Sequence, residues 1–188
     1  LRGASGAGKS SWLSRAAGLL SPSAGQSTVA GQALGQMGNA ARDLWRAKVI
    51  GFLPQKLHLS DALTVHGNLA LVYFAAGLPQ DDVAIRHALD VLGVADLAAR
   101  KLQQLSGGQA QRVALARAVL LAQAVILADE PTASLDDEAA RAALDLLQAS
   151  AQRCTATLVI ATHDRRVEQA LPHAQVHFLG IKSASDAQ

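Results

Sequence analysis

Eight residues near the start of the chain limit its possible folds more than any other stretch. They read Gly3-Ala4-Ser5-Gly6-Ala7-Gly8-Lys9-Ser10 and fit the spacing G-x-x-x-x-G-K-[ST]. Glycines at this spacing let successive backbone N–H groups curl around phosphate oxygens, the lysine reaches the β- and γ-phosphates, and the final hydroxyl can bind Mg²⁺. The alternative is a flexible glycine loop capped by a serine, which does not explain why all eight positions match.

A phosphate loop of this kind lies between a strand and a helix, because the helix N-terminus adds partial positive charge. Apolar residues at helical spacing predict that helix over residues 9–20, with four of them on roughly one face: Trp12, Leu13, Ala16 and Leu20. Two residues of lead-in are too few for the preceding strand, so we expect a chain that is truncated at its N-terminus.

Strand and helix patterns alternate along the rest of the chain. Short apolar runs predict buried strands, and apolar periodicity predicts helices. The predicted strands are 49–53, 124–128, 157–162 and 176–179, and the predicted helices are 107–122, 136–152 and a two-part segment over 63–99. Residues 26–42 predict short strands and turns, and residues 182–188 a frayed tail. The alternation indicates one α/β domain with a mainly parallel sheet, in which 63–99 is a candidate helical subdomain.

Composition argues against several function classes. The 188 residues carry a formal net charge of +2 without a basic run, so electrostatics do not imply a nucleic-acid partner. No apolar run approaches the roughly 20 residues needed to cross a bilayer. The single cysteine, Cys154, cannot form an internal disulfide, and we interpret it as a small, half-buried apolar residue.

Two adjacent carboxylates, Asp129 and Glu130, follow the predicted strand 124–128. Parallel α/β sheets bind their ligands at this end of their strands. Asp129 could hold Mg²⁺, directly or through water, while Glu130 could polarise an attacking water as a general base. Alone, such a pair is more typical of a solvated loop, but beside a phosphate loop it predicts a hydrolytic site.

Two further polar residues follow predicted strands in the same way. Gln55 comes after the predicted strand 49–53, and its side-chain amide could reach Mg²⁺ or the attacking water. A glutamine at the end of a strand is, however, usually just a polar surface residue. His163 follows 157–162 and could donate a hydrogen bond to the γ-phosphate. The other histidines lack this context, and we interpret them as surface or packing residues; they are His58, His66, His87, His173 and His177.

The stretch Leu105-Ser106-Gly107-Gly108-Gln109 opens the predicted helix 107–122. Ser106 and Gln109 have the S-x-x-Q spacing of a capping box, which starts a helix locally. That interpretation leaves both glycines unexplained, since two glycines in a first helical turn leave bare N–H donors and form a second anion site. A chain of this size has little need for two phosphate sites of its own.

Together, these motifs resemble the ATP-binding cassette (ABC) family, the nucleotide-binding subunits of ABC transporters. The resemblance covers nearly the whole chain, and the motifs occur in family order. They are Walker A at Gly3 to Ser10, the glutamine loop at Gln55, the signature at Leu105 to Gln109, Walker B ending in Asp129 and Glu130, the D-loop at Ala133-Ser134-Leu135-Asp136, and the switch histidine His163.

The resemblance implies a P-loop NTPase (RecA-like) core with a mainly parallel sheet over residues 1–58 and 113–188. An inserted helical subdomain, 59–112, would carry the signature loop. It also implies ATP and Mg²⁺ as cofactors, with the phosphates bound by Gly3 to Ser10 and by Ser11. Ser10, Gln55 and Asp129 would hold the metal, and Glu130, His163 and Gln55 would take part in hydrolysis.

The resemblance further implies a head-to-tail pair of cassettes, in which each ATP is shared between two chains. Asp136 would then cross the interface, and the partner's γ-phosphate would be bound by Ser106, Gly107, Gly108 and Gln109. ATP would close this dimer, and hydrolysis would reopen it to move integral membrane permease subunits. Residues 56–78 would receive the permease, which puts the chain in the cytoplasm at the inner face of the cell membrane.

Three departures from the family pattern stand out. No aromatic residue for adenine stacking lies before Walker A, and Ala110 follows the signature where a glutamine is common. Residues 100–104 lack the acidic segment of the large fused exporters. The region around Gln55 looks more like stand-alone subunits of the lipoprotein-releasing and macrolide-export type, or of importers.

Two other hypotheses stay open. One is an ABC-type ATPase without a membrane partner, although about fifty residues between Gln55 and the signature leave no room for a long coiled coil. The other is an inactive, truncated cassette, which the short N-terminal lead-in suggests.

Overall fold

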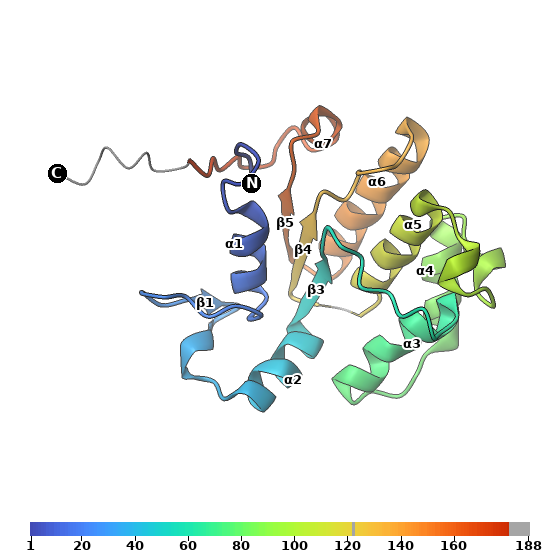
Figure 1. The fold of residues 1–188 in the computed structure, drawn as a ribbon, viewed down its shortest axis with the longest axis horizontal. Coiled ribbons are helices and arrows are strands. Elements are labelled where there is room, and N and C mark those ends of the chain that lie inside the picture. Colours follow the sequence, from blue (N-terminus) through green and yellow to red (C-terminus); the bar gives the residue numbers. More distant parts are fainter. Residues whose placement is uncertain (122, 181–188) are drawn as a thin grey trace.

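The computed structural model describes residues 1–121 and 123–180. At its centre, three parallel strands lie side by side in the order β3 (Ile50–Leu53), β4 (Val125–Asp129) and β5 (Thr157–Ala161). Ala128 of β4 pairs with Leu53 on one side and with Ile160 on the other. Because the strands run in one direction, their carboxyl ends meet at a single edge of the sheet, the upper edge in Figure 1.

An extended segment before the phosphate loop lies beside β5. The Thr162 amide donates to the Leu1 carbonyl at 3.2 Å, and the Arg2 amide donates to the His177 carbonyl at 2.8 Å. Arg2 and Phe178 form one isolated parallel bridge. The prediction of a strand over 176–179 is therefore wrong, because among the described residues this segment forms only the one isolated bridge between Phe178 and Arg2.

The helices are α1 (Lys9–Ala16), α2 (Asn39–Val49), α3 (Val65–Ala76), α4 (Asp82–Val91), α5 (Gly107–Ala118), α6 (Asp137–Arg153) and α7 (Arg165–Ala170). A small antiparallel hairpin, β1 (Thr28–Val29) and β2 (Gln32–Ala33), follows α1, and short 3₁₀ turns occupy Leu34–Gln36, Ala95–Leu97 and Leu102–Gln104. The two-part helical segment, the helix that follows β4 and the three strands are thus confirmed, although β5 is buried only at Ile160 and Ala161. The predicted tail 182–188 lies outside the described residues.

Several predicted boundaries are wrong. Helix α1 ends at Ala16 because Gly18 turns the chain with a φ of 69°, so Trp12 and Leu20, expected on its inner face, are 42% and 48% exposed. Helix α5 ends four residues before Ala122, at a Val119 cap. Val83 of α4, an apolar residue within the predicted helical segment 63–99, is 79% exposed.

Two helices were not predicted at all. Helix α2 begins inside the stretch 26–42 that was expected to form short strands and turns, and it extends to Val49, the expected first residue of β3. Helix α7 has six residues, too few to show a helical period.

The sheet separates two apolar clusters, because alternate side chains of a strand point to opposite faces. Val125 and Leu127 of β4 pack with Leu13 of α1 in the smaller cluster. Ile126 and Ala128 belong to the larger cluster, which includes residues of α3, α4, α5 and α6. Figure 1 shows α1 on one side of the sheet and α5 and α6 on the other.

The larger cluster continues from the sheet into the helices α3 and α4. Buried residues of both parts belong to it, including Leu69, Leu89 and Leu147. The division of the chain at residues 58 and 112 stays a prediction. Within residues 1–121 and 123–180, no helix combines the length and the apolar character needed to cross a membrane.

Gly51 offers a test of how closely α5 approaches the sheet. A Cβ at this position would overlap the carbonyl oxygen of Ala118, which is backbone and has no free torsion to move away. Gly51→Ala should therefore lower the free energy of unfolding by about 1–3 kcal/mol in urea titrations. The control is Gly35→Ala, whose Cβ would meet no described atom within 4 Å; equal losses in both variants would contradict the close approach.

Candidate phosphate-binding and catalytic site

The loop from Gly3 to Ser10 starts at the carboxyl edge of the sheet and turns directly into α1. Gly8, the N-cap of α1, has a φ of 88° and supplies no side-chain cap. The first N–H groups of this helix therefore have no side-chain oxygen from the N-cap, which is the condition for anion binding. Ala4, Ser5, Gly6 and Ser11, which complete the predicted phosphate site, are all exposed.

Lys9 folds back across this loop. Its Nζ donates to the carbonyl oxygens of Gly3 at 2.8 Å and of Ala4 at 3.1 Å. The ammonium group thus lies over the loop it was predicted to serve, held by two neutral acceptors. Phosphate oxygens would be stronger acceptors for this ammonium group, because they carry negative charge whereas the carbonyls are neutral.

Asp129, the last residue of β4, is buried beside Ser10 and Glu130. Burial raises the pKa of its carboxyl group, a hydrogen bond from Ser10 and the charge of Lys9 oppose this, and the charge of Glu130 adds to it. A desolvated carboxylate with a like charge beside it favours a cation. A carboxylate and a hydroxyl fit Mg²⁺, which takes one or two protein oxygens and completes its shell with water and substrate phosphates.

Glu130 begins the loop that follows β4 in a left-handed backbone conformation, with a φ of 50°. Its amide donates to the Ala161 carbonyl at 2.8 Å. One carboxylate oxygen accepts from the Thr162 hydroxyl at 2.9 Å, and the other lies 2.7 Å from Nδ1 of His163. Glu130 is nearly buried, whereas the His163 side chain is 82% exposed. The carboxylate is therefore held in place while the imidazole faces solvent.

Thr162 was not among the sequence predictions. Its hydroxyl donates to Glu130 and accepts from the Asp164 amide at 3.0 Å, so it links Glu130 to the histidine loop, which is formed by His163 and Asp164 after β5. The signal was a hydroxyl residue directly before His163 at a strand end, which the motif alone does not distinguish from a packing residue.

Gln55 lies two residues beyond β3 and is exposed. The pairing of Leu53 with Ala128 puts it at the same edge of the sheet as Asp129. Just after it, Arg117 of α5 donates to the carbonyl oxygens of Leu57 at 2.7 Å and His58 at 2.8 Å. The glutamine loop is thus fastened to α5, a contact that sequence analysis missed.

The predicted capping box at the start of α5 is confirmed. The Ser106 hydroxyl accepts from the Gln109 amide at 3.2 Å, and the Gln109 side chain accepts from the Ser106 amide at 2.8 Å. A Cβ at Gly107 would meet no described atom within 4 Å, and one at Gly108 would make only ordinary contacts with Ser134 and Leu135. Packing within the described chain thus requires neither glycine.

Asp136 caps α6, and its side chain accepts from the Ala139 amide at 2.8 Å. It is exposed, as a residue that reaches a partner must be. The loop before it is linked to α5, since Gln111 donates to the Pro131 carbonyl at 3.2 Å. It is also linked to the histidine loop, since the Thr132 hydroxyl donates to Asp164 at 2.6 Å.

The structure thus brings the predicted residues of the phosphate loop, Asp129, Glu130 and His163 to one edge of the sheet. The signature residues lie on α5, on the other side of the loop that follows β4. Among residues 1–121 and 123–180, no group of three or more His, Cys, Asp or Glu side chains could hold a metal by itself. A metal here would depend on the ligand's oxygens as well.

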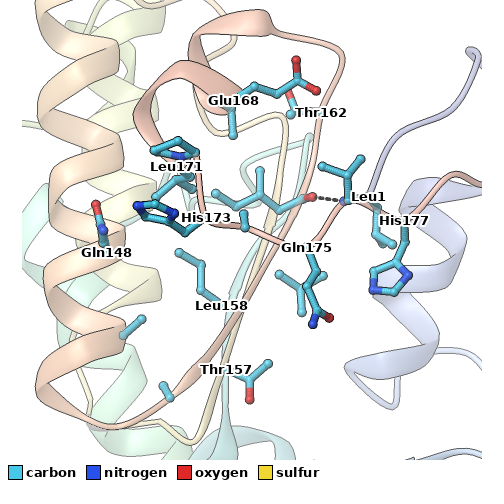
Figure 2. Close-up of a pocket in the computed structure, with 18 of the residues that line it drawn as sticks. Leu1, Gln148, Thr157, Leu158, Thr162, Glu168, Leu171, His173, Gln175 and His177 are labelled. Atoms are coloured by element: carbon cyan, nitrogen blue, oxygen red, sulfur yellow. Dashed lines mark hydrogen bonds between the residues drawn. The ribbon is translucent and has the colours of Figure 1, made fainter.

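A separate cavity of about 840 Å³ lies on the α6 side of β5, and Figure 2 shows its lining. Leu158, Leu171 and His173 belong to this lining, together with residues of α6 and of the segment before Val176. None of the predicted site residues lines it, so cavity size alone does not identify the site.

Comparison with known proteins agrees with this geometry. The family model described as "ABC transporter" matches residues 1–133. The chain is 38% identical to the lipoprotein-releasing system ATP-binding protein LolD of Chromohalobacter salexigens, over 86% of this chain and 69% of LolD. It is also 38% identical to the methionine import ATP-binding protein MetN of Carboxydothermus hydrogenoformans, over 88% of this chain and 49% of MetN. Because both match equally well, the predicted transporter type stays a prediction.

A solved structure of an ATP-binding cassette also resembles this chain. The dimeric post-hydrolysis state of the ATP-binding cassette MJ0796, bound to ADP and Pi, superposes with a TM-score of 0.84. Its sequence is 30% identical, and the match covers 90% of this chain and 75% of that one.

The hydrogen bonds of Asp164 in the histidine loop predict how the stability of the folded state changes in acid. Hydrogen bonds from the Arg166 side chain, with a further one from Thr132, lower the pKa of Asp164 to about 2 from its usual 3.8. An ionised Asp164 therefore stabilises the folded state above about pH 4, and this stabilisation is lost as the pH falls towards 2. Asp164→Asn should reduce unfolding free energy at pH 7, and its difference from wild type should vanish near pH 2. A constant difference across this range, or the same profile for the exposed Asp145→Asn of α6, would contradict this.

Proposed function

The chain belongs to the ABC transporter family as an ATP-binding and ATP-hydrolysing cassette, and we propose that its site residues serve two nucleotides. One nucleotide lies on the chain's own phosphate loop. The other lies on the phosphate loop of a second copy, facing this chain's signature loop. The observation that supports this proposal is the first turn of α5, where neither Gly107 nor Gly108 is required by packing among the described residues.

The chain's own half-site consists of Gly3 to Ser11 with Asp129, Glu130, Gln55 and His163. The backbone N–H groups at the start of α1, together with Lys9, would bind the β- and γ-phosphates. Ser10, Asp129 and Gln55 would hold Mg²⁺, which supplies charge neutralisation at the phosphates when it is bound.

Glu130 is the general base of this half-site. Its carboxylate has one oxygen on the Thr162 hydroxyl and one on His163, so its position is set before substrate arrives. The ionised Glu130 carboxylate accepts a hydrogen bond from Nδ1–H of His163, and in the imidazolium form of this exposed ring Nε2–H is left to donate to a γ-phosphate oxygen. A fixed base and a fixed donor on either side of one water favour in-line attack.

The partner's half-site consists of Ser106, Gly107, Gly108 and Gln109, with Asp136 at the interface. A two-fold axis lets one sequence supply both halves of each site. The dimeric state of MJ0796 supports this arrangement by similarity.

The membrane partner would dock beside the glutamine loop. A cavity of about 520 Å³ lies between α2, β3 and α3, and Leu44, Phe52 and Leu71 are among its lining residues. Phe74 of α3 and Leu78, just after this helix, extend the exposed apolar surface. A short apolar helix of an integral membrane permease fits this chemistry, and it would hold the chain at the inner face of the membrane.

Replacing the base tests the nucleotide assignment. Glu130→Gln should reduce ATP hydrolysis by about 10²-fold or more, because the water loses its base while both phosphate sites stay intact. The variant should therefore accumulate as an ATP-bound dimer, measured by size-exclusion chromatography with light scattering. Rapid turnover in this variant, without a dimer on ATP addition, would refute the proposed role.

The docking surface can be tested by photo-crosslinking in the native host. A crosslinking residue at position 74, whose Phe is 84% exposed, should give an adduct with a polytopic membrane protein that mass spectrometry identifies. The matched control is position 83, where Val is 79% exposed on α4, and it should give no such adduct. Adducts with soluble proteins alone would favour an ABC-type ATPase without a membrane partner.

A further inference from the structure

We propose that Arg166 is a positioning residue that locks the chain's own catalytic loop to the loop it presents to its partner. The inference rests on the proposed function, because it assigns one guanidinium to both nucleotides of the dimer. Arg166 is the second residue of α7 and had no role in the sequence analysis.

The Arg166 side chain reaches across to the loop between Glu130 and Asp136. Nη1 donates to the Leu135 carbonyl at 3.2 Å, and Nη2 donates to the Thr132 carbonyl at 3.3 Å. These acceptors are backbone atoms, so the contacts fix the path of the chain and not only a side chain. Leu135 is directly before Asp136, the predicted interface residue.

The same guanidinium holds the histidine loop. Nε donates to Asp164 at 2.9 Å, and Nη2 lies 2.8 Å from the same carboxylate oxygen. That oxygen also accepts from the Thr132 hydroxyl at 2.6 Å. Asp164 follows His163 directly, so the two loops share one charged junction.

The loop between Glu130 and Asp136 needs such a support. Glu130 and Ser134 both have left-handed backbone conformations, with φ of 50° and 62°. Conformations of this kind persist in non-glycine residues only when surrounding contacts over-determine them. Without Arg166, the loop that joins the base to the interface residue loses its contacts at the Thr132 and Leu135 carbonyls.

A fourth contact, from Nη1 to Asp137 at 2.9 Å, adds little to this junction. The Asp137 carboxylate is 94% exposed, and ion pairs in solvent contribute little. The planar fork of arginine, which reaches three acceptors at once, is the feature that lysine lacks.

Mixed dimers separate the two effects of Arg166. Differently tagged chains are paired so that one carries Glu130→Gln, which leaves a single functional site whose base comes from the other chain. Arg166→Ala is then introduced either on the chain with Glu130, the cis arm, or on the Glu130→Gln chain, the trans arm. We expect kcat for ATP to fall about 10-fold or more in both arms, with a smaller change in KM, since misplacing a catalytic group costs rate.

Two control substitutions show how each arm responds to a neutral change and to a change in the signature loop. Arg165→Ala, on the exposed neighbouring arginine, should change neither arm. Ser106→Arg should abolish turnover only in the trans arm. Thermal unfolding accompanies each variant, and Arg166→Lys, which keeps the charge but not the fork, serves as the second variant if the alanine form unfolds.

Loss in both arms for a folded Arg166 variant supports the inference. Loss in one arm only, or full activity of both arms with Arg166→Lys, overturns it while leaving the proposed function intact. Absence of even one hydrolysis event per mixed dimer, measured in a single-turnover experiment without any Arg166 change, overturns the head-to-tail pairing and the inference with it, because a dimer held closed by its Glu130→Gln site can still hydrolyse the ATP in its functional site once.

Discussion

The parallel pairing of β3, β4 and β5 is the constraint on which the rest of the molecule depends. Because β4 is buried along its whole length, with neighbours on both sides, its register cannot slip without moving apolar side chains out of both clusters. The carboxyl ends of these strands therefore remain aligned along one edge of the sheet. Asp129 ends β4, while Glu130, His163 and Gln55 lie just beyond the ends of β4, β5 and β3, and all four depend on that alignment for their common edge.

The parts of this arrangement that could be predicted from sequence are the ones with local causes. A buried strand needs a continuous apolar run, and Val125 to Ala128 provides one. A helix start needs a cap within three residues, and Ser106 and Gln109 provide it. The motifs that follow strands could be placed at one edge because parallel topology brings such positions together, although no sequence signal determines how their side chains meet.

The missed features involve contacts between distant residues. Arg117 bonds to carbonyls about sixty positions away, and Thr162 bonds to a carboxylate 32 positions away. Every residue has a carbonyl, so an arginine that uses one as its acceptor has no sequence partner to look for. Helix α2 was also missed; none of its residues is buried, and it packs against α3 and β3.

Helix α5 rigidly connects two parts of the proposed site. Its twelve residues span about 18 Å, with the signature glycines at one end and Arg117, which holds the Leu57 and His58 carbonyls, near the other. A hydrogen-bonded helix of this length resists compression and bending, so its ends cannot shift independently. A displacement of the segment after Gln55 must therefore tilt the whole helix. A contact made at the surface beside Leu57 and His58 thus changes the position of the signature glycines at the other end of α5.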